Sequence, residues 1–236
     1  MTGDGGRRRA VLFDFFGTLV TYQPDRNLLG YPDTHARVTR HGYRFDHARF
    51  VTDWDTASAE LEDISDRSHD EFSMTDAASA FARAAGLDVT AADLHDLGVS
   101  FVAEWQRHIR PVDGMVELVR ELCGSYRLGI VSNTHDPNMV PALLADFGID
   151  GCFDVVTLSV VHGRRKPHPA IYLDTLDVLQ IDASSTVFVG DSFDADYHAP
   201  TAIGMDSFLI TTDDQRVPER CRLASIVELR SRLRAR

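Results

Sequence analysis

The sequence AVLFDFFGTLV, at residues 10–20, decides the fold class of this 236-residue chain. Its first four residues are all apolar, so they predict a short strand that is buried on both faces, as in a parallel sheet. Later apolar runs of the same kind predict four further strands, at Leu128–Val131, Val155–Leu158, Thr186–Val189 and Ser207–Ile210.

Helical patterns lie between these strands. One covers Gly114–Cys123, with Asp113 as the expected cap. Another covers Pro137–Phe147, with Asp136 as the expected cap and proline at the first helical position. Because strands and helices alternate, the sequence predicts an α/β fold with an open, mainly parallel sheet.

The stretch from about Thr21 to Arg110 breaks this alternation, since it holds no convincing buried strand. It contains helical patterns instead, at Phe45–Ile64, at Met74–Ala85, and at Ala91–Ile109 after Thr90 and Asp93. An all-helical insert directly after the first strand predicts a cap domain. We therefore expect a catalytic core of residues 1–20 and 111–236 and a helical cap of residues 21–110.

Composition narrows the classes of partner. With 44% apolar and 25% charged residues the chain can bury a sizeable core, and its net charge of -12 would repel a nucleic acid. No stretch approaches the length of a membrane span, so we expect no membrane partner. Three scattered cysteines without metal-ligand spacing favour a reduced, cytoplasmic protein and give no sign of zinc. We expect a small-molecule substrate and either a monomer or a homodimer.

Polar residues follow three of the predicted strands at the point where each strand ends. They are Asp14, the pair Ser132-Asn133 and the pair Asp191-Ser192, and a fourth polar segment covers Gly163–Pro167. In open α/β sheets ligands gather at the carboxyl ends of the strands, so these side chains should converge. A carboxylate, hydroxyl and amide donors, a cation and a second carboxylate would suit phosphoryl transfer.

A divalent metal has a clear task in such a site. Asp14 and a phosphate are both anionic, and two unit charges about 4 Å apart interact by roughly 4 kcal/mol at an effective dielectric near 20. Mg²⁺ held by Asp14 and Asp191, with Lys166 nearby, would offset that repulsion. Lys166 is also the only lysine among 24 Lys and Arg residues, and a compact ammonium is not interchangeable with a guanidinium.

These residues resemble the motifs of the haloacid dehalogenase superfamily. The four motifs, in the expected order, are Phe13–Leu19, Val131–Asn133, Arg165–Pro169, and Val189–Ser192 followed by Asp196. The resemblance covers most of the chain outside the helical insert. It implies a Rossmann-like core with a helical cap between the first and second motifs, which agrees with the independent interpretation of residues 21–110.

The resemblance also implies roles for single residues. Asp14 would be the nucleophile, with Ser132 and Lys166 assisting the chemistry. The residues expected to bind the transferred group are Ser132, Asn133, Lys166 and Thr18. The expected Mg²⁺ ligands are Asp14, Asp191 and the backbone carbonyl of Phe16, with Ser192 and Asp196 in support and Asp194 as a further acid in the same loop.

One position departs from the pattern of the phosphatases in this superfamily. They usually carry an acidic residue two positions after the nucleophile, where it protonates the leaving group, and this chain has Phe16. General acid–base catalysis contributes about 10²- to 10⁴-fold. The leaving group could be a good one, another acid could serve, or the reaction could be a different one.

Three functions therefore stay open. Dehalogenases of the superfamily carry an aromatic residue at the position of Phe16, and halide needs no proton to leave. They do not need a metal, however, and Gly190-Asp191 suits Mg²⁺. We therefore favour a Mg²⁺-dependent phosphatase acting through an aspartyl-phosphate. The alternatives are a carbon–halogen hydrolase and a weakly active or non-catalytic phosphate-binding homologue.

Further residues are candidates for substrate contact or for hinges. Histidines that could reach a substrate are His41, His69 and His168, and Arg164 and Arg165 could recognise an anion or form a solvated loop. In the insert, the candidates for substrate contact are Tyr22, Asp25, Arg26 and Arg44, and the hinge candidates are Gly30 and Gly42.

Overall fold

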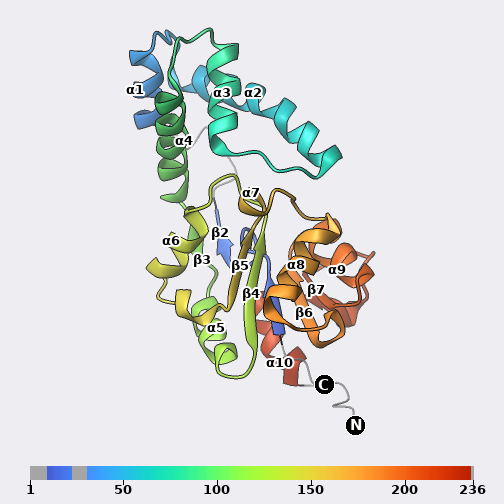
Figure 1. Cartoon of the computed structure of the whole chain (residues 1–236). Coiled ribbons are helices and arrows are strands. Elements are labelled where there is room, and N and C mark those ends of the chain that lie inside the picture. Colours follow the sequence, from blue (N-terminus) through green and yellow to red (C-terminus); the bar gives the residue numbers. More distant parts are fainter. Residues whose placement is uncertain (1–9, 23–30, 235–236) are drawn as a thin grey trace.

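A six-stranded sheet forms the centre of the computed structural model, which describes residues 10–22 and 31–234. The strand order is β5-β4-β1-β6-β7-β8, and every neighbouring pair is parallel (Figure 1). The strands are β1 Ala10–Phe13, β4 Arg127–Ser132, β5 Val155–Leu158, β6 Thr186–Gly190, β7 Asp206–Ile210 and β8 Arg222–Leu223. The five predicted strands are confirmed to within one residue at each end. The edge strand β8 has only two residues, too few for a recognisable pattern.

The order of the strands fixes where ligands can bind. From β1 the chain builds β4 and β5 on one side, then returns to build β6, β7 and β8 on the other. The connections therefore diverge between β1 and β6, and ligands bind beside such a switch point in open α/β sheets. Asp14 follows β1 and Asp191 follows β6, so both carboxylates start from this point.

Apolar side chains alternate between the two faces of the sheet, and both faces are covered by helices. Along β1, Val11 and Phe13 pack with α5 Met115–Cys123, α6 Met139–Asp146 and α10 Leu229–Arg234. Ala10 and Leu12 pack on the opposite face with α8 Pro169–Leu179 and α9 Ala199–Ala202. All four strand residues are fully buried, as predicted. Burial of each large apolar side chain contributes about 1.5–3 kcal/mol, which holds the strand ends in place.

Two helices of the core begin later than the sequence predicts. The first, α5, starts at Met115, because Gly114 adopts a left-handed conformation (φ 75°) and occupies the capping position expected for Asp113. The second, α6, starts at Met139, and its capping residue is Asn138. Asp136 still serves this end, since its Oδ1 accepts hydrogen bonds from the backbone amides of Asn138 and Met139, both at 2.8 Å.

The described residues of the insert form four helices, which pack around an apolar cluster of their own. They are α1 Pro32–Arg40, α2 His47–Ser68, α3 Met74–Ala84 and α4 Ala91–Gln106, of which α1 was not predicted. Capping boxes start two of them, Ser73 with Asp76 at α3 and Thr90 with Asp93 at α4. The cluster is built on stacked aromatic rings: the centroids of Trp54 and Phe101 lie 4.4 Å apart.

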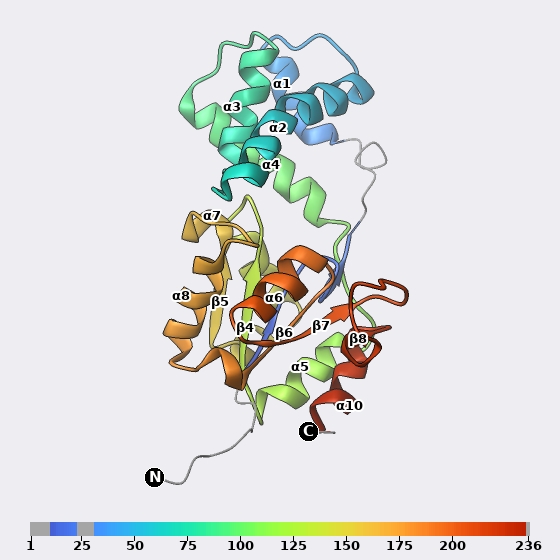
Figure 2. The same cartoon turned by 90° about the vertical axis from the view of Figure 1, so that its right-hand side faces the viewer.

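A two-stranded antiparallel ribbon joins the insert to the sheet. Its strands are β2 Val20–Thr21 and β3 Arg110–Pro111. The predicted boundaries at residues 20/21 and 110/111 fall on this ribbon. Both views place α1–α4 at the end of the sheet where the parallel strands terminate, beyond the loops that carry Asp14 and Asp191 (Figures 1 and 2). The remaining short helical segments are α7 Ser159–His162, Asp150–Cys152, Ala183–Ser185, Phe193–His198, Glu219–Cys221 and Ile226–Glu228.

Candidate active site

A buried ammonium joins two carboxylates at the ends of the central strands. Lys166 Nζ lies 2.7 Å from Asp14 Oδ1 and 2.7 Å from Asp196 Oδ1. The three side chains are 3%, 9% and 1% exposed for Lys166, Asp14 and Asp196. Asp14 and Asp196, which are 152 and 30 residues away from Lys166 in the sequence, thus both contact its ammonium group.

The environment of Asp14 opposes a full negative charge. Burial raises the pKa of Asp14 to about 7, while Lys166 lowers it and the nearby Asp196 adds to the rise. The second carboxylate oxygen accepts a hydrogen bond of 3.0 Å from the hydroxyl of Thr18. Thr18 therefore holds the orientation of Asp14 in this structure, a contact that differs from its predicted role in phosphate binding.

The environment of Lys166, in contrast to that of Asp14, favours the charged form of the side chain. Burial alone would lower its pKa, but the ion pairs with Asp14 and Asp196 outweigh that effect and hold the pKa above its ordinary value. The ammonium is therefore fully charged at neutral pH. A charged, buried donor at this place can neutralise anionic oxygens without a proton leaving it.

Asp196 connects Lys166 to the loop that follows β6. Its Oδ2 accepts hydrogen bonds from the backbone amides of Asp191 (3.1 Å) and Ser192 (2.9 Å), while its Oδ1 contacts Lys166. A side chain at position 190 would clash with it, because a Cβ added to Gly190 would lie 2.3 Å from Cγ of Asp196. Asp196 thus fixes the loop that carries Asp191 and Ser192.

The acidic residues fit a divalent cation. Carboxylate oxygens of Asp14, Asp191 and Asp196 all lie within 4.8 Å of one another. Three carboxylates face one ammonium, which leaves an excess of two negative charges when all are ionised, and hard oxygen ligands are those that Mg²⁺ prefers. Desolvation and the charge of Asp196 raise the pKa of Asp191, and the charge of Lys166 offsets only part of that rise.

Gly17 permits this close approach and was not recognised from the sequence as a site residue. It has a φ of +82°, and a Cβ placed on it would lie 2.2 Å from Oδ2 of Asp191. Only glycine combines that backbone conformation with the available space. The loop after β1 can therefore pass directly beside the second carboxylate.

Asn133 clamps the backbone of Lys166. Its Oδ1 accepts a hydrogen bond from the Lys166 amide at 2.8 Å, and its Nδ2 donates to the Lys166 carbonyl at 3.0 Å. One Nδ2 hydrogen remains for a ligand. Ser132 is fully buried, and its hydroxyl lies 3.4 Å from the carbonyl of Asn133. Residues predicted to bind phosphate thus also position the lysine.

A cavity of about 250 Å³ opens between this site and the helical insert. Phe16 lies in its wall, and the ring of Trp105 is 5.4 Å from that of Phe16 and 5.8 Å from that of Tyr22. The other lining residues are Met74, Phe101, Val102, Asn133, Thr134, His135, Asp136 and Met139. Burial, together with the charges of Asp191 and Asp14, raises the pKa of Tyr22, so this candidate residue lies beside the acidic site.

An ionic network between the insert and the core was not predicted. Glu71 has a fully buried side chain, and its carboxylate lies 3.1 Å from Nδ1 of His135 and accepts a hydrogen bond of 2.7 Å from the hydroxyl of Ser159. Glu62 contacts both Nε2 of His135, at 3.1 Å, and Nη1 of Arg165, at 3.0 Å. The partners are 73 and 103 residues apart, so sequence spacing gave no signal for these pairs.

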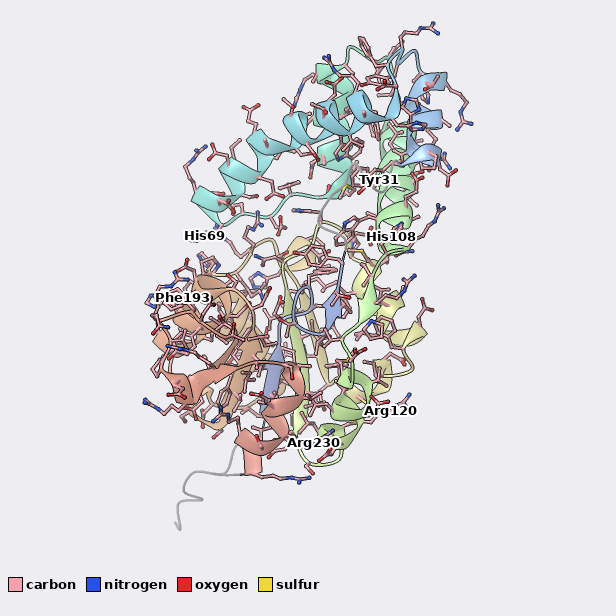
Figure 3. The ribbon with its side chains drawn as sticks, turned by 180° about the vertical axis from the view of Figure 1, so that it is seen from behind. Tyr31, His69, His108, Arg120, Phe193 and Arg230 are labelled. Carbon is pink, nitrogen blue, oxygen red and sulfur yellow. The ribbon has the colours of Figure 1, made fainter. Side chains whose placement is uncertain are left out.

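The remaining candidates lie outside the acidic cluster. Arg164 and Arg165 pair with acids of the insert, Asp70 and Glu62 respectively, so neither extends freely toward a substrate. His41 lies beside Asp93 within the insert. The rings of His69 in the insert and His168 in the core lie 6.1 Å apart. Figure 3 shows His69 at the end of α2 that is nearest the core. Exposed positions are Arg44, Gly42 and Asp194, and Asp25, Arg26 and Gly30 lie outside the described residues.

None of the helices in the described part of the chain combines the length and the apolar character that a membrane span requires.

Residues 8–204 match the family model of the haloacid dehalogenase-like hydrolases. The chain therefore belongs to this family and is a hydrolase. The human haloacid dehalogenase-like hydrolase domain-containing protein 3 is 32% identical over 100 residues, or 42% of this chain and 39% of that protein. The chain thus spans about two fifths of the length of this relative. The ribulose-1,5-bisphosphate 5-phosphatase of Halopiger xanaduensis is 26% identical over 213 residues, covering 87% and 86% of the two chains.

Solved structures show the same fold. A 2-haloacid dehalogenase from Pseudomonas syringae superposes with a TM-score of 0.69, covering 97% of this chain and 99% of that one. Its sequence is 18% identical, so the likeness speaks for the Rossmann-like core with helices inserted after the first strand and not for a shared substrate.

Proposed function

We propose that this protein is a Mg²⁺-dependent phosphatase that acts on a small phosphorylated molecule through an aspartyl-phosphate on Asp14. The observation that carries the proposal is the buried triad of Asp14, Lys166 and Asp196, with an oxygen of Asp191 within 4.8 Å of the acids. Asp14 and Asp191 offer the carboxylates that would hold Mg²⁺, with the backbone carbonyl of Phe16 as a further proposed ligand and Asp196 in support. The bound cation would supply charge neutralisation for the anionic phosphate.

The proposed reaction has two displacements at phosphorus. A carboxylate oxygen of Asp14 forms a bond to phosphorus as the bond from phosphorus to the leaving oxygen breaks, and the leaving oxygen keeps the electron pair. Water then attacks the phosphorus, the bond to Asp14 breaks, and inorganic phosphate keeps the protons of the water. Lys166 stays charged throughout, and one free hydrogen of the Asn133 amide can bind a phosphate oxygen.

Phosphatase chemistry is preferred over the chemistry of the dehalogenases for two reasons. A relative that aligns along most of the chain is named as a phosphatase, while the dehalogenase likeness rests on fold at 18% identity. The acidic cluster also has an excess of negative charge that suits a divalent cation, which halide displacement does not require.

The aromatic residue at position 16 favours a second candidate, a carbon–halogen hydrolase. Release of chloride from 2-chloropropionate in the presence of EDTA would support this alternative. A homologue that binds phosphate without turning it over is a third candidate, which tight phosphate binding without hydrolysis would support.

The test compares two acids of neighbouring loops. Asp14→Asn should lower Mg²⁺-dependent release of phosphate from acetyl phosphate by about 10³-fold or more, since it removes the nucleophile. Asp194→Asn is the matched control, because Asp194 is exposed and lies outside the acidic cluster. Full activity in Asp14→Asn would rule out the proposed mechanism.

We also propose that the protein works in the cytoplasm, as a monomer or a homodimer. Its three cysteines, Cys123, Cys152 and Cys221, are free thiols, which is usual for proteins in a reducing compartment.

A further inference from the structure

The wall of the cavity next to Asp14 is aromatic on the side that faces the insert. Phe101 of α4 contributes to it, together with three rings that contact one another: Phe16 from the loop after β1, Tyr22 directly after β2, and Trp105 from α4. The centroids of these three rings are separated by 5.4 to 6.3 Å, with interplanar angles of 52° to 88°. Rings held at such angles present both edges and faces to a guest, which is the arrangement that a further aromatic ring prefers.

Two polar side chains of the cavity, His135 and Asp136, are already engaged by the protein. Both ring nitrogens of His135 face carboxylates, Glu62 at Nε2 and Glu71 at Nδ1. Asp136 accepts from two backbone amides of α6. No lysine or arginine occurs among the described residues that line the cavity. A sugar with several hydroxyl groups, or a second phosphate, would find few free partners there.

The size of the cavity suits one ring. An apolar cavity of about 150 Å³ is enough to hold benzene, and this one measures about 250 Å³. Phe16 is two residues from Asp14, and Asn133 lies in the same wall while its amide holds the backbone of Lys166. A group bound in the cavity is therefore directly next to the proposed phosphoryl site.

The presence of Phe16 at the usual position of the general acid also favours an aromatic leaving group. Phe16 cannot protonate a leaving oxygen, which favours a leaving group that can depart as an anion. A phenol has a pKa near 10, as in tyrosine, whereas an alkanol is about as weakly acidic as water, with a pKa of about 15.7. A phenolate is accordingly a far better leaving group, and it carries the ring that the cavity can accommodate.

We infer that the substrate is a phosphate monoester of a phenol or a similarly acidic aromatic alcohol, with the ring bound in the cavity against Phe16, Tyr22 and Trp105. This inference rests on the proposed phosphatase function and adds the identity of the leaving group. The bond from Asp14 to phosphorus forms as the bond to the aryl oxygen breaks. The phenolate takes the electron pair and gains its proton from solvent afterwards, and water completes the reaction as described above.

Two pairs of compounds separate ring binding from leaving-group ability. Phenylphosphonate and cyclohexylphosphonate are similar in size and cannot be cleaved at oxygen. Each aromatic contact typically contributes a factor of about 2 to 12, so phenylphosphonate should inhibit acetyl phosphate hydrolysis at least about fivefold more tightly. For the substrates phenyl phosphate and cyclohexyl phosphate, kcat/KM should differ by about 10² or more, in the order of leaving-group acidity.

Substitutions at the wall test the place of binding. Trp105→Leu keeps an apolar side chain and should reduce the advantage of phenylphosphonate to about twofold or less, and Tyr22→Leu is a second variant at a side chain that is 42% exposed. Phe45→Leu is the matched control, because Phe45 is 54% exposed and does not line the cavity. It should preserve the wild-type preference.

The outcomes distinguish the two proposals. If acetyl phosphate is hydrolysed with Mg²⁺ but neither phenyl compound has an advantage, the aromatic substrate class is wrong and the phosphatase proposal stands. The same conclusion follows if Trp105→Leu and Tyr22→Leu both retain the full preference. If neither acetyl phosphate nor phenyl phosphate is hydrolysed, the phosphatase proposal fails, and this inference fails with it.

Discussion

The stability of the contact between the helical insert and the core should depend on the charge of His135. Its Nε2 lies 3.1 Å from Glu62 of α2, and its Nδ1 lies 3.1 Å from the buried Glu71. His135 can donate to both carboxylates at once only when both of its ring nitrogens carry protons. Arg165 faces the same two acids, and Phe72 stacks on the imidazole with its centroid 4.1 Å away.

These contacts set the size of the expected effect. Burial alone would lower the pKa of His135, but the hydrogen bonds and charges of Glu62 and Glu71 raise it from 6.5 to about 9. This difference between the pKa values of the unfolded and folded states corresponds to about 3 kcal/mol in the free energy of unfolding. Because the pKa is higher in the folded state, the contribution is complete below pH 6.5 and is lost as pH rises through 9.

The comparison uses wild type and His135→Gln in urea unfolding at pH 6, 8 and 10. The variant should be less stable by about 3 kcal/mol at pH 6, and the difference should fall toward zero at pH 10. His108→Gln is the control, since His108 is exposed at the end of α4 (Figure 3). A difference between wild type and His135→Gln that does not change with pH would refute the reasoning.

Three further substitutions test the site. Phe16→Asp should raise kcat/KM for a poor-leaving-group phosphate such as glycerol 3-phosphate by about tenfold or more, and no gain would mean that leaving-group protonation is not limiting. Gly17→Ala should weaken Mg²⁺ binding by about tenfold or more in calorimetric titration, because its Cβ would lie 2.2 Å from Oδ2 of Asp191. Gly42→Ala is the control, since Gly42 also has a positive φ but lies in open space, and it should leave Mg²⁺ binding unchanged. Lys166→Met should lower the free energy of unfolding by about 3–5 kcal/mol without Mg²⁺, since two buried carboxylates lose their cation, and an unchanged value would contradict the ion pairs.

The position of a side chain can be predicted from the sequence when that residue directly follows a buried strand. Asp14 and Asp191 directly follow buried strands, so their position at one edge of the sheet follows from parallel pairing. Lys166 lies on a loop, and its place between two acids could be expected only from the resemblance of its motif. The helix starts at Met115 and Met139 differ from prediction because a left-handed glycine and a turn at Asp136 delay them.

Other features depend on packing between distant segments. Trp105 and Phe16 are far apart in the chain and meet only because the ribbon β2–β3 returns α4 to the loop after β1. Glu71 looks like an ordinary loop acid in the sequence, yet its side chain is fully buried against His135. Arg165 was a candidate for binding a substrate anion, but it forms an ion pair with Glu62 of the insert. No local pattern encodes these pairs.

The central claim is that phosphorus becomes bonded to Asp14. Acetyl phosphate labelled at phosphorus, mixed with enzyme and Mg²⁺ and quenched in acid within one turnover, allows the label to be mapped by peptide mass spectrometry. The account predicts label on Asp14, and none when Mg²⁺ is chelated. Release of phosphate with Asp14 unlabelled, or with the label on another residue, would contradict it.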